Sequence, residues 1–369
     1  MTPGNPISRR RLLNLASVAA VAGLPLPVMA RVLEGRAAGA AREGIDLGVV
    51  PAVGMIEIHD GRLGAPWAAG RKSLETPDPV TTTGRWHIGS NAKSMTATLI
   101  ARLVEQGRLD WSTPLVRLLP DTPMRDEYRT VTLPDLLSHR AGFARNSAAG
   151  IERVDASGET AERYRRRLYI EGALEEAPEG PVSSGPGSYS NTGFVIAGAV
   201  AERVAGKPFE QLMQDEVFTP LGIGSVGFGG TPEGEIAGHR AGVPLYGEDA
   251  DNPDFLRPAG GLHLTLTDWG TFVLDQMQGQ AGRGRLLSRE SYTLLHRPQG
   301  DSQNGLGWGL EPAPNGEPMW SHNGSNGRWF GMVVVLPRSS RAAMVVANAA
   351  GDDVERLING VIVRALDLA

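Results

Sequence analysis

The chain has 369 residues, of which 41% are hydrophobic and 21% are charged, as in an ordinary globular protein. Its formal net charge is −5 and its arginines are scattered, which argues against nucleic acid as the main partner. The absence of cysteine excludes disulfides, thiolate metal sites and a cysteine nucleophile. A chain of this length can form two domains, or one large domain with an insertion.

The N-terminal segment has the pattern of an export signal. Ser8 and three successive arginines precede an apolar run that ends near Ala30, and small residues at its end offer cleavage after Ala22, Ala30 or Ala40. The paired arginines resemble the twin-arginine type of signal. We therefore expect residues 1–40 to be an export signal and the mature protein to be periplasmic or secreted. The alternative is the basic N-terminal helix of a cytoplasmic protein.

The same run is too short to be a membrane-spanning helix, and Pro25 and Pro27 interrupt it. No second hydrophobic segment would hold the protein in a membrane. We therefore expect no stable membrane insertion after the signal is removed; the oligomeric state has no signature in the sequence.

Residues 49–70 read as a strand, a turn at Asp60-Gly61 and a weaker return strand. An amphipathic helix is expected from Ser90 to a stop signal at Gly107. From about residue 115 to 250 strands are hard to find. There, residues 156–177 look like an exposed charged helix, and residues 194–206 like an amphipathic or buried helix ending in glycine.

Beyond Arg257, the runs 329–338 and 341–349 are apolar and β-branched, and a polar turn separates them, so they read as adjacent antiparallel strands. The tail over residues 352–368 has helical periodicity and an acidic start. The sequence therefore predicts a mixed α/β architecture: an antiparallel sheet flanked by helices, built from residues 41–115 and 257–369. A mostly helical domain over residues 116–256 would be inserted between these two segments.

Ser90 and Lys93 stand at the start of the first long helix. Lysine occurs only at positions 72, 93 and 207, so this one replaces the arginine that the chain otherwise prefers. Residues three apart on a helix lie on nearly the same face, so the amine can reach the hydroxyl. Lysine can take a serine proton if its pKa is lowered, whereas arginine cannot. The alternative is an N-capping serine with a surface lysine.

Two further stretches carry candidate residues. The glycine-rich turn GPGSYSNTG, at 185–193, presents Tyr189 and Asn191 just before a helix, where both side chains could enter one cleft. The stretch MWSHNGSNGRWF, at 319–330, places His322-Asn323-Gly324 before a strand, and the glycine would let a substrate backbone approach closely. The alternatives are a buried tyrosine, a turn asparagine and a structural histidine.

Together these stretches resemble the serine β-lactamase and penicillin-binding-protein family, specifically its class C β-lactamase and esterase branch. Ser90-Asn91-Ala92-Lys93 matches the Ser-x-x-Lys of this family, and Tyr189-Ser190-Asn191 matches the Tyr-x-Asn of this branch. His322-Asn323-Gly324 falls where β-lactamases have Lys-Thr-Gly. VTLPDLLSHRAGF, RPAGGLHLT and GLGWGL agree as weaker signatures, so the resemblance covers nearly everything after the predicted signal.

The resemblance implies a β-lactamase/transpeptidase-like fold and hydrolysis through an acyl-enzyme on Ser90. It implies that Lys93 and Tyr189 share the proton transfers, with the lysine charge keeping the phenol's pKa low enough for a base. Asn191 would hold the substrate's amide or the Lys93 ammonium, and the backbone N–H groups of Ser90 and Ser325 would form the oxyanion hole, with Gly324 beside them. Neither a metal nor a nucleotide cofactor is implied.

Histidine at 322 departs from the lysine that β-lactamases use to bind a substrate carboxylate. Since histidine is mostly neutral near pH 7, we expect weak or absent β-lactamase activity. Arg328 could supply the missing charge, or it could be a solvated arginine at a strand edge. The substrate would be a small ester, a D-amino peptide or a β-lactam, and the sequence does not select among them.

Other classes of hydrolase lack their signatures here. No Gly-x-Ser-x-Gly pentapeptide indicates an α/β-hydrolase, and the seven histidines show no metal-ligand spacing. His139 is expected to be structural. The remaining alternative is a non-catalytic protein of the same fold that binds peptidoglycan fragments or a partner.

Overall fold

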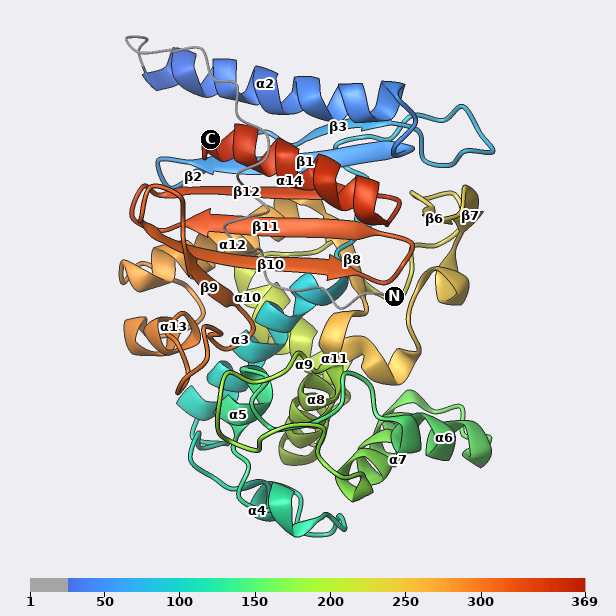
Figure 1. Ribbon diagram of the computed structural model, residues 1–369, viewed down its shortest axis with the longest axis vertical. Helices are drawn as coiled ribbons and strands as arrows, with labels where there is room; N and C mark the ends of the chain where they lie inside the picture. The colour runs from blue at the N-terminus through green and yellow to red at the C-terminus, as the bar shows by residue number, and fades with distance from the viewer. Residues whose placement is uncertain (1–25, 369) are drawn as a thin grey trace.

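The computed structural model describes the backbone of residues 26–368 and the side chains of residues 35–368, so most of the predicted export signal lies outside the described residues. Its centre is one antiparallel sheet with the strand order β2-β1-β12-β11-β10-β9, and β3 also pairs with β1 (Figure 1). The strands are β1 Ala52–His59, β2 Arg62–Leu63, β3 Trp67–Gly70, β9 Gly309–Pro312, β10 Pro318–Ser325, β11 Phe330–Leu336 and β12 Arg341–Ala347.

The first and last parts of the chain meet in this sheet, because β1 pairs directly with β12. The predicted hairpin at Asp60-Gly61 is confirmed, and both residues have the positive φ that a tight hairpin turn requires. The predicted pairing of the two late apolar strands is confirmed as β11 and β12.

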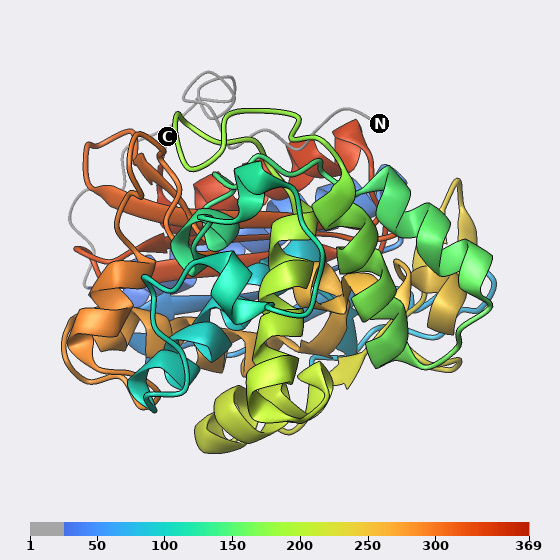
Figure 2. The same cartoon turned by 90° about the horizontal axis from the view of Figure 1, so that it is seen from below.

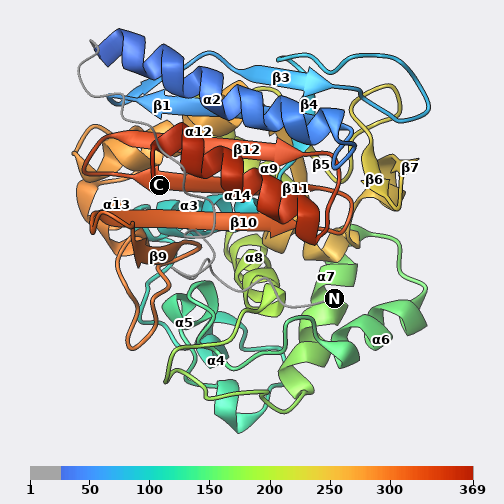
Figure 3. The same cartoon turned by 45° about the horizontal axis from the view of Figure 1, so that its top comes forward.

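Helices cover both faces of the sheet. Alternate residues of its strands therefore pack into two different hydrophobic cores, one on each face. On one face, Met332 and Val334 pack with α2 (Leu26–Asp46) and α14 (Asp352–Leu366), which lie across the sheet in Figure 3. On the other face, Val333 and Val335 join a larger core with α3 (Ala92–Glu105), α8 (Asn191–Ala205) and α12 (Leu266–Gln280). The acidic start of α14 was predicted correctly.

A helical region lies below the sheet in Figure 1, and α8 runs through its centre when it is seen from below (Figure 2). Its helices are α4 Leu115–Leu118, α5 Leu133–Leu137, α6 Ala148–Ser157, α7 Glu162–Glu175, α9 Phe209–Met213 and α10 Thr219–Leu221. The predicted boundaries at 115/116 and 256/257 remain a proposal. Between residues 222 and 256 the chain already forms β5 (Gly227–Phe228), which pairs with β8 (Leu262–Thr265), and β8 in turn pairs with β4 (Arg85–His87).

Two helices differ from their predictions in burial. The predicted exposed helix over 156–177 is instead the last two residues of α6, a break over residues 158–161, and α7. Arg166 on α7 is fully buried among glutamates. Helix α3 was expected to be amphipathic but is buried on all sides from Ala92 to Ala101. Its hydroxyl groups are satisfied internally, as Thr96 shows by donating to the Pro258 carbonyl at 2.8 Å.

Two short strands and two helices remain to be named. They are β6 Gly238–Arg240, β7 Val243–Leu245, α11 Arg257–Gly260 and α13 Arg289–Leu295. Within residues 26–368, none of the helices combines the length and apolar character needed to cross a bilayer.

Candidate active site

Ser90 lies in a single 3-10 turn, η1 (Gly89–Asn91), that leads directly into α3. Gly89 has a φ of +54°, and a Cβ atom there would lie only 2.8 Å from the backbone nitrogen of Ser325. Asn91 fixes the turn from the other side, because its Nδ2 donates to the carbonyls of Ile88 and Gly331 at 2.6 and 3.1 Å. These contacts hold the half-buried Ser90 against the end of β10.

Lys93 is fully buried and its Nζ atom has three polar neighbours. It lies 3.1 Å from Ser90 Oγ, 2.7 Å from Asn191 Oδ1 and 2.5 Å from the carbonyl of Ala259 on α11. Burial, and then the positive charge of Arg145, lower the pKa of Lys93 well below its ordinary value. A neutral amine has two N–H groups, which the amide and carbonyl oxygens can accept, and its lone pair remains for the Ser90 proton.

Tyr189, in the glycine-rich turn before α8, also contacts Ser90 Oγ. Its hydroxyl donates to Ser90 Oγ at 2.7 Å. Burial raises the pKa of Tyr189, although its hydrogen bond to Ser90 and the charge of Arg145 act in the other direction. The expectation of a phenol with a low pKa is therefore wrong: Tyr189 keeps its proton, and Lys93 is the group that burial drives toward its neutral form.

His322 lies half-buried on β10. Burial and the charge of Lys93 lower the pKa of His322 to about 3, and its Nδ1 donates to the Asn323 carbonyl at 2.6 Å. The remaining ring nitrogen, Nε2, is then an acceptor. The residue in the place of the β-lactamase lysine thus carries no positive charge near pH 7.

The backbone around Ser90 runs in close contact with the backbone around Gly324 and Ser325. A Cβ atom at Gly324 would lie 2.4 Å from the backbone nitrogen of Ser90, and one at Gly89 would collide with Ser325, so the two segments run in close contact. A side chain at either glycine would collide with the other segment, so the backbone nitrogens of Ser90 and Ser325 both lie at this contact. This is the arrangement an oxyanion hole requires.

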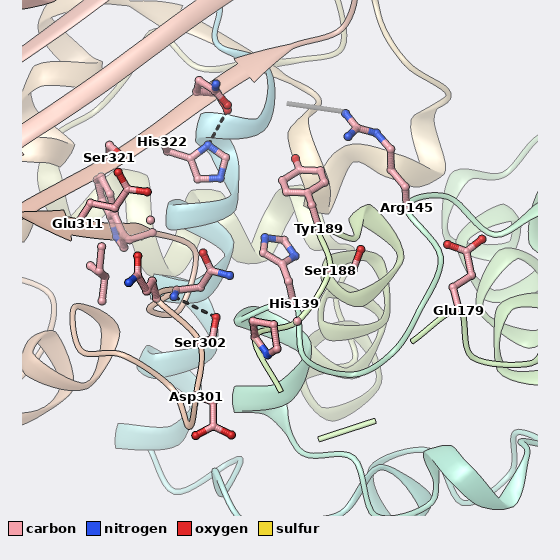
Figure 4. A pocket seen from close by; sticks show the side chains of 18 residues that line it. His139, Arg145, Glu179, Ser188, Tyr189, Asp301, Ser302, Glu311, Ser321 and His322 are labelled. Carbon is pink, nitrogen blue, oxygen red and sulfur yellow. Dashed lines mark hydrogen bonds between the residues drawn. The ribbon is translucent and has the colours of Figure 1, made fainter. Parts of the chain in front are cut away.

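A cavity of about 680 Å³ is lined by Tyr189 and His322. Figure 4 shows Tyr189 and His322 next to each other, with Arg145 on one side of them and Glu311 on the other. The remaining lining includes the segment 186–188, the loop 301–304, and residues 308–310 and 321–323. Ser90 and Lys93 do not line this cavity themselves, and Tyr189, which does, connects it to Ser90 through the hydrogen bond of its hydroxyl to Ser90 Oγ.

The sequence analysis missed two residues of this cavity. His139 was expected to be structural, and its contacts are of that kind: its ring packs at a tilt against Tyr189 with the ring centres 4.6 Å apart, and its Nδ1 accepts from the backbone N–H of Ser190 at 3.1 Å. Its place in the cavity lining was not predicted. Arg145 was not noticed, and its guanidinium lies 4.8 Å from the centre of the Tyr189 ring. The place of His139 in LLSHRAG was the signal available in the sequence.

Arg328 does not line this cavity. Its guanidinium donates to the carbonyl of Asn326 two residues earlier, at 2.9 Å. Across residues 35–368, no set of three or more histidine, aspartate or glutamate side chains is placed to bind a metal ion.

Comparisons with known proteins agree with this geometry. The family model described as Beta-lactamase matches residues 37–366. Penicillin-binding protein 4 of Amycolatopsis lactamdurans is 29% identical over 81% of each chain. D-alanyl-D-alanine-carboxypeptidase/endopeptidase AmpH of Escherichia coli (strain K12) is 23% identical over 70% of this chain and 69% of its own.

The fold is also that of a solved relative. The D-stereospecific amidohydrolase from Streptomyces sp. superimposes with a TM-score of 0.68 at 24% identity, covering 87% of this chain and 97% of its own. The expected β-lactamase/transpeptidase-like fold and serine hydrolase class are thus confirmed, and the chain belongs to the Beta-lactamase family.

Proposed function

We propose that this protein hydrolyses a carboxylic ester or a D-amino-acid amide or peptide through an acyl-enzyme on Ser90. The observation that carries this proposal is the convergence of two proton-handling groups on one oxygen, with Tyr189 at 2.7 Å and Lys93 at 3.1 Å from Ser90 Oγ. A serine hydroxyl needs such a partner before it can act as a nucleophile.

Lys93 acts as the general base in acylation. Its neutral amine takes the Ser90 proton while Oγ attacks the acyl carbon, and the new oxyanion accepts hydrogen bonds from the backbone N–H groups of Ser90 and Ser325. Asn191 holds the amine in place through its Oδ1 and is itself anchored by donating from Nδ2 to Asn146 Oδ1 at 2.9 Å.

Tyr189 acts as the acid for the leaving group. When the tetrahedral intermediate collapses, the bond to the leaving atom breaks and the phenol proton goes to that atom, and the proton held by Lys93 then restores the phenol. Water attacks the acyl-enzyme by the reverse sequence of transfers and releases the acid. His139 keeps the phenol ring in position by packing against it.

The neutral His322 supports our hypothesis of weak or absent β-lactamase activity. A β-lactam brings a carboxylate into the site, and the histidine cannot provide the permanent positive charge of a lysine. A D-amino peptide or amide is favoured over β-lactams by the names of the relatives, among them the carboxypeptidase AmpH and the Streptomyces amidohydrolase.

We also propose export by a twin-arginine signal, followed by cleavage after Ala22 or Ala30. Ala37 and Ala41 of α2 are fully buried in the core shared with α14, so cleavage after Ala40 would remove packed structure. The intact mass of the protein secreted by a host with this pathway identifies the cleavage site.

The proposed function is tested with steady-state kinetics on four substrates: a short acyl ester, an N-acyl-D-alanyl-D-alanine peptide, its all-L isomer and a cephalosporin. We expect turnover of the ester or the D-peptide, little of the other two, and none with Ser90→Ala. Cephalosporin turnover that rivals the ester would contradict the β-lactamase part of this proposal. Full activity of Ser90→Ala would contradict all of it.

A further inference from the structure

The site binds substrate beside a histidine that carries no charge, yet a cation does line the same cavity. Arg145 is exposed at the cavity, in the loop between α5 and α6. In the part of the chain whose side chains are described, no hydrogen bond or ion pair engages its guanidinium. Glu179, Asp301 and Glu311 line the cavity too, but none of them forms an ion pair with it.

The backbone of Arg145 is held firmly against the catalytic segment. Its carbonyl accepts from the backbone N–H of Asn191 at 2.8 Å, and the carbonyl of the preceding Ala144 accepts from Ser190 Oγ at 2.8 Å. The loop therefore runs alongside residues 190–191, and this contact places the guanidinium 4.8 Å from the centre of the Tyr189 ring.

The position of Tyr189 indicates which part of the substrate would lie near the Arg145 guanidinium. In the proposed mechanism, the phenol gives its proton to the leaving atom, so the leaving group has to lie beside Tyr189. The cavity that Tyr189, His322 and Arg145 line lies on that side of the site. Because Arg145 lies beside the Tyr189 ring and lines the same cavity, a leaving group in that cavity would lie within reach of its guanidinium.

We propose that Arg145 binds a carboxylate carried by the leaving group, so that the preferred substrate releases an amino acid with a free carboxylate. The proposal rests on the proposed function above. The acyl C–N bond breaks as the acyl–Oγ bond forms, and the amine nitrogen takes the Tyr189 proton and departs as an amino acid. Arginine suits this role, because its planar guanidinium donates two parallel hydrogen bonds to a carboxylate.

Arg328, the cation that the sequence analysis considered, offers the matched comparison. It is half-buried, bonds back to Asn326 and lies outside the cavity lining. We therefore expect Arg145→Ala to change the preference for a carboxylate and Arg328→Ala to leave it unchanged.

The test compares two substrates that differ only at the leaving group: an N-acyl-D-alanyl-D-alanine peptide with a free carboxylate, and the same peptide as its C-terminal carboxamide. The measured quantity is the ratio of their kcat/KM values in the wild type, Arg145→Ala, Arg145→Lys and Arg328→Ala. Loss of the Arg145 charge also changes the pKa of Lys93, and this would change the rate with both substrates equally. The ratio of the two kcat/KM values cancels that shared effect.

We expect the wild type to favour the free carboxylate. Arg145→Ala should lower this ratio about 10- to 100-fold, as loss of a charged hydrogen bond does. Arg145→Lys should restore part of it, and Arg328→Ala should leave it unchanged. An equal loss on both substrates with Arg145→Ala would contradict the proposal, as would a fall in the ratio with Arg328→Ala.

A separate reaction with a neutral acyl ester shows whether a negative result concerns Arg145 alone or the proposed function as a whole. If the ester acylates Ser90 but the wild type does not favour the carboxylate peptide, the assignment of Arg145 is wrong and the proposed function stands. If no substrate acylates Ser90, the proposed function fails and this inference fails with it.

Discussion

The hydroxyl of Tyr189 donates a hydrogen bond to Ser90 Oγ at 2.7 Å, although the two residues are 99 positions apart in the chain. The contact joins the end of the glycine-rich turn before α8 to the turn before α3. Each turn is held by a hydrogen bond between a side chain and the backbone: the N–H of Ser190 donates to the His139 ring, and the Asn91 amide donates to the Gly331 carbonyl on β11. The chain thus positions the phenol before any substrate arrives.

Replacing this hydroxyl tests its role as proton donor. Tyr189→Phe keeps the ring that packs against His139 but removes the O–H, so we expect kcat to fall about 10²- to 10⁴-fold. Far-UV circular dichroism should remain that of the wild type. The loss should be smaller on an ester whose leaving group is a good one and needs no proton; an equal loss on good and poor leaving groups would argue against the donor role.

Lys93 should show its lowered pKa in the pH dependence of acylation. The free amine is the acting form, so kcat/KM should rise with pH through that lowered pKa and level off well below the ordinary lysine value. Lys93→Arg should abolish acylation, because a guanidinium keeps its proton. Lys207→Arg, at an exposed ion pair with Asp215, is the control and should match the wild type. An active Lys93→Arg variant would exclude lysine as the base.

Much of this site could be predicted from the sequence, because its motifs are local. Ser90 and Lys93 share one helical turn, and Tyr189 and Asn191 share one glycine-rich turn, so short-range spacing indicated both pairs. The pKa of Tyr189 could not be predicted, since it depends on burial by distant segments. Arg145 was missed for a similar reason: only the pairing of its loop with residues 190–191 brings it to the cavity.

The same distinction holds for the fold. The apolar, β-branched strands and the hairpin turn at Asp60-Gly61 could be predicted from the sequence pattern alone. The burial of Arg166 was not, because a charged sequence such as ERYRRR normally marks a solvated face. Three glutamates from α7, α8 and α9 surround its guanidinium, and this convergence exists only in the tertiary structure.

That buried cluster gives a stability prediction. Arg166→Met leaves Glu202 buried without its partner, so we expect the free energy of unfolding to fall by about 3–5 kcal/mol. The matched control is Arg203→Met, which breaks an exposed pair with Asp121 and should cost less than about 1 kcal/mol. Urea unfolding of both variants measures the difference; equal losses would show that the cluster contributes no more than a surface pair.

A buried histidine away from the site should make the fold sensitive to acid. Burial lowers the pKa of His296 from 6.5 to about 3, and its ring stacks on Trp320 at 3.8 Å. Below about pH 6.5 the unfolded chain binds a proton that the folded chain does not, so stability falls with pH by at most about 1.4 kcal/mol per unit from this residue.

His296→Phe should remove this part of the acid sensitivity. Within the described residues neither ring nitrogen of His296 has a hydrogen-bond partner, so the change should cost little at pH 7. We expect the variant to lose less Tm than the wild type between pH 7 and pH 4 in thermal melts. Identical slopes for the two proteins would show that His296 does not titrate on unfolding.

The central claim is that Ser90 becomes acylated, and intact-mass spectrometry tests it most directly. The mature protein and its Ser90→Ala variant are mixed separately with a short acyl ester and with a D-alanyl peptide, quenched in acid and weighed. The account predicts an acyl adduct on the wild type alone, which peptide mapping places on Ser90. An adduct of equal yield on both proteins would contradict it, and absence of any adduct or turnover would favour a protein of this fold that binds without catalysing.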